Sequence, residues 1–279
     1  MGIEIGARSD VGRVRSQNED SYKVLAPLNL FILSDGMGGE SHGEVASALA
    51  VETVATHCQE ASNNVAVPFY GEPKPSLSEK TNRLGSAVRL ANRKIREAAQ
   101  EVAARRGMGA TILAAWVDGP RLSLVHVGDS RAYLLRTGVM DQLTSDHSLV
   151  AEQVRRGLLT PQQADASEMQ SVLIRALGTD AEVEIDADEH VLLDGDILLL
   201  SSDGLTRMVT DPEIASTLLT HSNALAAADR LVELANEYGG EDNVTAIVVQ
   251  IRQEPEGLFG YLRRWMRHSA PASAEREGM

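Results

Sequence analysis

Cysteine is nearly absent from this chain of 279 residues, which contains only Cys58. A single cysteine excludes a disulfide within the chain and any cysteine-rich metal site. No apolar run approaches the roughly 20 residues that a membrane-spanning helix requires. Residues 1–6 also lack the basic start and apolar core of a signal peptide. We therefore expect a cytoplasmic protein without a transmembrane segment.

Basic residues are outnumbered, with 26 Lys and Arg against 40 Asp and Glu and a net charge of −14. This balance argues against a nucleic-acid binder, because contacts with a phosphate backbone need basic patches. Hydrophobic residues make up 43% and charged residues 24% of the chain, which is typical of a globular protein. The length suits one large domain or two small ones.

Apolar segments that end in an aspartate recur along the chain. Residues 30–34 form such a run (with one serine), followed by Asp35 and then by glycines at 36, 38 and 39. The pattern returns in residues 122–129, in residues 196–203 and, inverted, in residues 242–251. A buried strand would hold its terminal carboxylate rigidly, and glycine lets the backbone approach a ligand closely. A single Asp-Gly usually marks a turn, so the hypothesis of a site depends on this repetition.

Antiparallel pairing would bring these carboxylates together. If the strands on either side of turn 26–29 form a hairpin, Asp20 and Asp35 lie side by side at its open end. Asp203 and Asp242 would share one sheet edge in the same way. Clustered carboxylates repel each other strongly at low dielectric. Cations would relieve this repulsion, and ligands that are all oxygen favour Mg²⁺ or Mn²⁺ over zinc.

Local patterns assign most of the remaining chain. An alanine-rich helix is expected at 44–58, and apolar residues every three or four positions predict a second helix at 78–106. Residues 61–80 contain prolines and two adjacent asparagines, and we predict a mobile loop insert there. Further elements are expected as helices beginning at Asp211 and Asn223 and as a last strand, 243–251. Strand-rich blocks separated by helices favour an α+β fold, an antiparallel sandwich flanked by helices.

Two features each have two interpretations. Residues 144–181 are polar and predicted to be helical in short pieces, with Thr160 capping a helix that starts at Pro161. They form either a flap over the site or a solvated excursion, and the sequence leaves both open. Arg15, taken alone, is a solvated loop residue. Beside a metal-bound acidic cluster, its guanidinium would suit a bidentate phosphate clamp.

Six short motifs occur together and in order. They are Val-Arg-x-x-Asn-Glu-Asp at 14–20, Asp-Gly-Met-Gly-Gly at 35–39, Gly-Asp-Ser-Arg at 128–131, Leu-Thr-x-Asp-His-Ser at 143–148, Ser-Asp-Gly-Leu at 202–205 and Gly-x-Asp-Asn at 240–243. Over roughly residues 3–251 the chain resembles the bacterial branch of the metal-dependent Ser/Thr protein phosphatases, type 2C (the PPM family). The resemblance implies a four-layer α-β-β-α sandwich of two antiparallel sheets, with a two-metal centre at one end.

The resemblance also implies a role for each matched residue. Asp35 would bridge two Mn²⁺ or Mg²⁺ ions, and the Gly36 carbonyl would ligate one of them. Asp203 and Asp242 would ligate the other ion. Asp129, together with Asp203, matches the position of a third, weaker ion. Arg15 matches the residue that would grip the substrate phosphate. Glu19, Asp20 and Asn243 would lie just outside the metal ligands. Of these, Glu19 and Asp20 would hold metal-bound waters.

The predicted reaction is hydrolysis of phosphoserine and phosphothreonine on proteins, opposing a bacterial Ser/Thr kinase. Two cations lower the pKa of a bridging water, and the hydroxide attacks phosphorus in line. Arg15 and the metals stabilise the equatorial charge as the alkoxide leaves. Met37 stands where some relatives carry a histidine, a proposed general acid, so the group that protonates the alkoxide is unassigned. A cysteine-based phosphatase is excluded, because Asn64 stands where its arginine, six positions after Cys58, is needed.

Two other functions stay open. A catalytically inactive module could keep the fold and bind phosphoproteins, but such a protein would be expected to have lost carboxylates. The predicted carboxylates Asp20, Asp35, Asp203 and Asp242 are all present. A two-metal phosphodiesterase or nuclease fits the aspartates but not the acidic balance of the chain.

We predict a catalytic domain at residues 1–253 and a tail at 254–279 that lies outside the resemblance. Residues 257–268 are aromatic and basic. They are read either as a terminal helix that packs on the domain or frays, or as a docking helix for a partner or an anionic membrane surface. Residues 164–172 lack the basic run common in relatives, which leaves substrate selection open. We expect a monomer.

Overall fold

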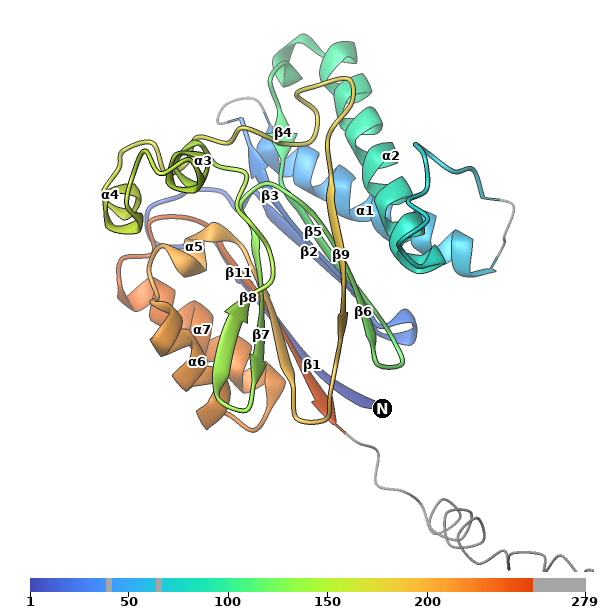
Figure 1. Cartoon of the computed structure of the whole chain (residues 1–279). Helices are drawn as coiled ribbons and strands as arrows, with labels where there is room; N and C mark the ends of the chain where they lie inside the picture. The colour runs from blue at the N-terminus through green and yellow to red at the C-terminus, as the bar shows by residue number, and fades with distance from the viewer. Residues whose placement is uncertain (39–41, 64–66, 253–279) are drawn as a thin grey trace, which may run out of the picture.

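The computed structural model describes residues 1–38, 42–63 and 67–252 and consists of two antiparallel sheets with helices outside them (Figure 1). The first sheet has the order β1 (Gly2–Asp10), β11 (Val244–Arg252), β10 (Ile197–Ser201), β7 (Arg131–Arg136) and β8 (Val139–Gln142). The second has the order β2 (Asp20–Leu25), β3 (Leu30–Met37), β5 (Ile112–Asp118), β6 (Arg121–Val127) and β9 (Asp186–Val191), and β4 (Gly109–Ala110) pairs with β3.

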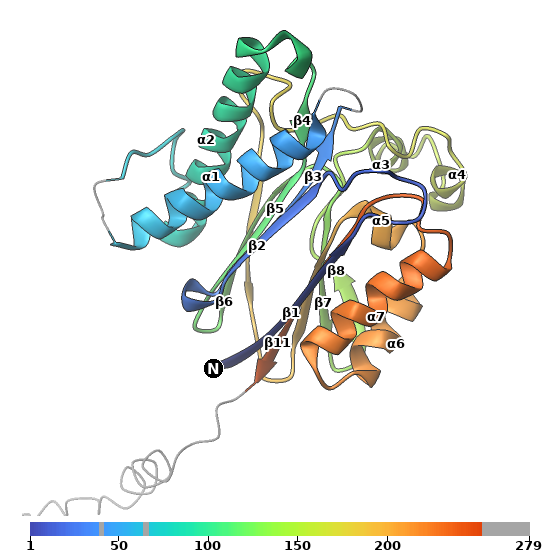
Figure 2. The same ribbon diagram turned by 180° about the vertical axis from the view of Figure 1, so that it is seen from behind.

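Helices cover the outer face of each sheet, as the view from behind also shows (Figure 2). On the second sheet lie α1 (Gly43–Asn63) and α2 (Glu79–Glu101), and on the first lie α6 (Asp211–Thr220) and α7 (Ala224–Glu237). The short helices are α3 (Leu149–Arg155), α4 (Pro161–Asp165) and α5 (Asp203–Thr206), with 3₁₀ turns at Ala26–Leu28 and Ala103–Arg105. The predicted four-layer α-β-β-α sandwich is therefore confirmed.

Three apolar layers hold the sandwich together. Alternate residues of each strand point to opposite faces of a sheet. In β3, Phe31 and Leu33 therefore enter the layer between the sheets, whereas Leu30 and Ile32 pack under α1 and α2. All four side chains are fully buried. Cys58 is fully buried in the same layer, where it packs against the other apolar side chains.

The pairing predicted for the aspartates is confirmed. Asp20 is the direct partner of Asp35 in the β2–β3 hairpin. Strands β10 and β11 are antiparallel and pair Ser201 with Ala246. Asp35, Asp203 and Asp242 lie at the same end of the sandwich, and Asp129, just after β6, lies there as well.

Several element boundaries differ from the predictions. The second helix ends at Glu101 instead of residue 106, because Val102 adopts an extended conformation. The strand that follows this helix is interrupted at Thr111, between β4 and β5. Strands β8 and β9 were not predicted, since their sequences are polar and lie at sheet edges.

Other predicted features fall partly outside the described residues. Residues 64–66 of the predicted insert and the tail from 253 onward are not described. Between 144 and 181 the chain forms α3 and α4, and Thr160 caps α4 as predicted. Among the described helices, none is both long and apolar enough to cross a membrane. The domain boundaries stay predictions.

Candidate active site

A cavity of about 230 Å³ opens at the end of the sandwich where the aspartates meet. Its wall includes carboxylates from widely separated segments, namely Glu19, Asp35, Asp129, Asp203 and Asp242. Asp20 lies beside them, 8% exposed. The predicted set of acidic residues is thus brought together by the fold. Arg15, Gly36 and Asn243 line the same cavity.

Hydroxyl groups from neighbouring segments hold the two aspartates of the hairpin. The Asp35 amide donates to Thr111 Oγ1 over 2.9 Å, and the hydroxyls of Thr111 and Ser130 are 2.8 Å apart. Asp20 Oδ2 accepts hydrogen bonds from Ser202 Oγ at 2.8 Å and Thr245 Oγ1 at 2.7 Å. The bonds to Asp20 fix the orientation of its carboxylate, and the bond from the Asp35 amide fixes the backbone that carries the Asp35 carboxylate.

Two buried carboxylate oxygens have no partner among the described residues. They are Asp20 Oδ1 and Asp203 Oδ1. Buried polar atoms are rarely left without a hydrogen bond, because burial removes the contacts they make with water. Two such atoms in one acidic cluster fit a site built for cations.

Glycines allow the backbone to pack tightly around the cluster. A Cβ on Gly36 would lie 2.2 Å from the carbonyl oxygen of Gly43 at the start of α1, and 2.8 Å from that of Glu19. A Cβ on Gly204 would lie 2.0 Å from the carbonyl oxygen of Asn243. No side chain larger than hydrogen fits at either position without moving the backbone. The glycines after Asp35 and Asp203 therefore serve close packing at the site.

Asn243 holds the loop that carries Arg15 and Glu19. Its Oδ1 accepts from the Glu19 amide at 2.8 Å, and its Nδ2 donates to the carbonyls of Val11 and Gln17, each at 2.9 Å. Its side chain thus positions the loop between β1 and β2, and its described contacts are with backbone atoms. The placement of Asn243 just outside the metal ligands stays a prediction.

Burial and mutual repulsion disfavour the ionised forms of the clustered carboxylates. Burial, followed by the charges of Asp203 and Asp242, raises the pKa of Asp20 to about 7 even though two hydroxyls oppose the shift. Burial and the charge of Asp203 raise the pKa of Asp129 to about 8. The pKa of Asp35 is raised well above its ordinary value by burial and by Asp20. Divalent cations would reverse this penalty by favouring the ionised forms.

Two arginines face the carboxylates. Arg15 Nη2 lies 2.9 Å from Asp242 Oδ2, so the predicted phosphate clamp forms an ion pair with a predicted metal ligand. Arg207 pairs with Asp203, and its Nη1 lies 3.8 Å from the same Asp242 oxygen. Arg207 was not predicted from the sequence. Its spacing of four residues from Asp203, in a segment that forms a helix, was the available signal.

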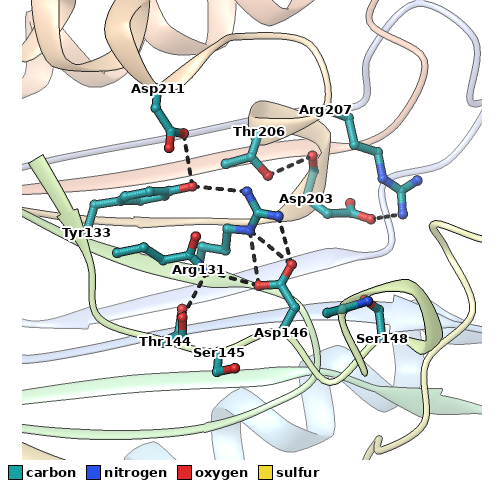
Figure 3. Close-up of polar contacts among 12 residues, drawn as sticks. Arg131, Tyr133, Thr144, Ser145, Asp146, Ser148, Asp203, Thr206, Arg207 and Asp211 are labelled. Carbon is teal, nitrogen blue, oxygen red and sulfur yellow. Dashed lines mark hydrogen bonds and ion pairs between the residues drawn. The ribbon is translucent and has the colours of Figure 1, made fainter. Parts of the chain in front are cut away.

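A second cavity of about 830 Å³ adjoins the first, beneath α3 and α4. Arg131 donates three hydrogen bonds to Asp146 at its border and also contacts Tyr133 Oη (Figure 3). From residues 144–181, interpreted above as either a flap or a solvated excursion, Ser171 and Leu173 line the first cavity. This segment therefore borders the site, and its role as a flap stays a prediction.

The donor set suits Mn²⁺ or Mg²⁺. Carboxylates and a backbone carbonyl are hard oxygen ligands, which these ions prefer over nitrogen and sulfur. The unpartnered oxygens of Asp20 and Asp203 and the raised pKa values of the aspartates are consistent with this chemistry.

Comparisons with known proteins agree with the geometry. A model of the family "Protein phosphatase 2C" matches residues 13–239. The serine/threonine phosphatase Stp of Listeria innocua is 36% identical over 87% of this chain and 94% of its own length. PstP of Mycobacterium tuberculosis, a serine/threonine protein phosphatase, is 41% identical over 89% of this chain and 45% of its own length.

A solved structure is similar as well. The catalytic domain of the serine threonine protein phosphatase PstP, in complex with two manganese ions, has a TM-score of 0.76 and 37% identity. The match covers 90% of this chain and 99% of that one. A family match over most of the chain, relatives above 30% identity and a shared fold lead to one conclusion: the chain belongs to the protein phosphatase 2C family.

Proposed function

We propose that this protein is a metal-dependent phosphatase that hydrolyses phosphoserine and phosphothreonine on other proteins. The single observation that carries the proposal is the convergence of the predicted carboxylates on one cavity that also contains Arg15. A phosphomonoester is dianionic, and an acidic cavity binds such a group only when cations are present. The metal requirement follows from the charge of the site.

The ligand roles are proposed residue by residue. Asp35 and the Gly36 carbonyl would hold one ion, and Asp35, Asp203 and Asp242 would hold the other. The ions would be Mn²⁺ or Mg²⁺, and Asp129 with Asp203 is the predicted position of a third. Glu19, Asp20 and Asn243 lie outside the ligands; Asp20 is oriented by hydroxyls, and Asn243 ties down the loop of Glu19.

The chain's own residues bind and orient the phosphate. When bound, two divalent cations lower the pKa of a shared water and neutralise charge that develops on phosphorus. Arg15 pairs with Asp242. If that carboxylate held an ion, the guanidinium of Arg15 would be available to hold two phosphate oxygens. Met37 carries no proton to donate, so the departing alkoxide takes its proton from another group.

The inactive phosphoprotein-binding module is the alternative function. Its geometry would be the same, but it would not need the carboxylates that the chain retains. We also propose a cytoplasmic monomer that opposes a Ser/Thr kinase in signal transduction; the relatives named as Ser/Thr phosphatases support this context. The proposed docking helix, 257–268, lies outside the described residues.

The test is hydrolysis of p-nitrophenyl phosphate and of a phosphothreonine peptide with added Mn²⁺. We expect Asp35→Asn, Asp203→Asn and EDTA each to remove most of the activity. Asp118→Asn is the matched control, because Asp118 is an exposed residue at the end of β5 whose carboxylate pairs with Lys80. Full activity in Asp35→Asn or Asp203→Asn would refute the metal assignment. Phosphopeptide binding without turnover in the Mn²⁺-loaded wild type would favour the alternative.

A further inference from the structure

The guanidinium of Arg207 lies where the two cavities meet. It pairs with Asp203 Oδ2, and its Nη1 lies 3.8 Å from Asp242 Oδ2. The Arg207 side chain is 26% exposed. It borders both cavities, and Asp129 and Asp203 also border both. Figure 3 shows Arg207 extending from the end of α5 toward the carboxylate of Asp203.

Arg207 lies at the junction of the two cavities, which Asp129 and Asp203 also line. Among the described residues that line the first cavity, the cations are Arg15 and Arg207. Arg15 pairs with Asp242 and is not among the described residues that line the second cavity. Arg131 lies two residues after Asp129 in the sequence, but its guanidinium is held by Asp146 and Tyr133. Of these three arginines, Arg207 is the one that borders both cavities, together with Asp129 and Asp203.

A guanidinium and a divalent ion compete for one carboxylate oxygen. An arginine side chain stays charged at any pH at which the protein is folded. Repulsion between close charges is strong in a partly buried site. The i, i+4 spacing holds Arg207 against Asp203 without any long-range rearrangement.

We propose that Arg207 is a built-in counter-ion that fills the Asp129–Asp203 position, so that the protein binds two divalent ions and excludes a third. This inference rests on the proposed metal centre and concerns its composition. It predicts that the number of bound ions depends on the charge at residue 207. The chain therefore departs here from the three-ion arrangement that its motifs imply.

The experiment is a calorimetric titration of the metal-stripped full-length protein with MnCl₂, with bound ions counted by native mass spectrometry. The test variants are Arg207→Gln, which removes the charge, and Arg207→Lys, which keeps it. Arg155→Gln is the matched control, because Arg155 borders the second cavity but pairs with Glu152. Circular dichroism checks that each variant is folded.

We expect two Mn²⁺ ions in the wild type, in Arg207→Lys and in Arg155→Gln. In Arg207→Gln a third ion should bind at least about tenfold more tightly than in the wild type, which is about 1.4 kcal/mol. Adding Asp129→Asn to Arg207→Gln should abolish that third ion. Unchanged ion number and affinity in Arg207→Gln would overturn the proposal, as would a raised KM for phosphopeptide with unchanged metal binding, the behaviour of a substrate contact.

A second variant keeps the test decisive if Arg207→Gln does not fold. Asp129→Asn in the wild-type background should leave the Mn²⁺ isotherm unchanged, and loss of a bound ion would overturn the proposal. Asp35→Asn separates the two hypotheses. If neither the wild type nor Asp35→Asn binds Mn²⁺, the proposed metal centre is refuted. If the wild type binds Mn²⁺ but the number of bound ions does not depend on residue 207, only the proposed role of Arg207 is refuted.

Discussion

In the metal-stripped protein, replacing Asp20 with asparagine should stabilise the fold increasingly as the pH rises. The pKa of Asp20 is raised to about 7, chiefly by burial. Between the ordinary value of 3.8 and this value, the native state holds a proton that the unfolded state has released. Stability falls with rising pH wherever the native state binds more protons. Asparagine at this position has no proton to lose.

The expected magnitude follows from the same two pKa values. The interval from 3.8 to about 7, at about 1.4 kcal/mol per pH unit, corresponds to about 4 kcal/mol. Asp20 is 8% exposed, so solvent screening reduces this value little. A domain is typically stable by about 5–15 kcal/mol. Ionisation of this one carboxyl therefore removes a substantial part of the stability of the metal-free protein.

The assay is urea unfolding in EDTA at several pH values between 4 and 8, for the wild type and Asp20→Asn. The comparison uses the difference between the two proteins, because buried histidines also titrate in this range. We expect the free energy of unfolding of Asp20→Asn to rise relative to that of the wild type by about 4 kcal/mol across the range. Saturating Mn²⁺ should stabilise the wild type most at high pH, since cations favour the ionised carboxylates. A difference that is constant with pH, or that falls, would refute the reasoning.

Three further predictions concern the site and its border. Burial lowers the pKa of His147 to about 4. The free energy of unfolding should therefore fall by up to about 3 kcal/mol as the pH drops from 6.5 to 4. In urea unfolding, His147→Gln should lose this pH dependence. Arg131→Met leaves Asp146, whose side chain is 12% exposed, without its ion pair and should cost about 2–4 kcal/mol, whereas an unchanged Tm would contradict this. Gly36→Ala forces a Cβ to 2.2 Å from the Gly43 carbonyl and should abolish Mn²⁺ binding in calorimetry; retained binding would show that the start of α1 can move.

Prediction from sequence succeeded where local patterns decide structure. The hairpin of β2 and β3 has a short turn, so its register, and with it the pairing of Asp20 and Asp35, could be worked out by counting residues outward from that turn. The cap of α4 at Thr160 and that of α7 at Asn223 were found from residue type alone.

Prediction failed where packing outweighs local preference. Strand β9 is polar and partly exposed, and its pairing with β6 makes it a strand. The break at Thr111 follows from its hydrogen bonds to Asp35, which belongs to a different part of the sequence. Nothing in the residues next to Thr111 indicates that its hydroxyl will be needed there.

The sequence by itself determined the acidic balance, the strands that end in aspartate and the set of oxygen ligands, because each depends on residue type and short-range periodicity. Only the tertiary structure decided which charges neutralise these carboxylates. Asn243 holds Glu19 across 224 residues, and Arg15 reaches Asp242 across 227. Contacts over such separations depend on how the two sheets stack, and side-chain partners at the cluster are selected by distance and burial after the sheets have packed.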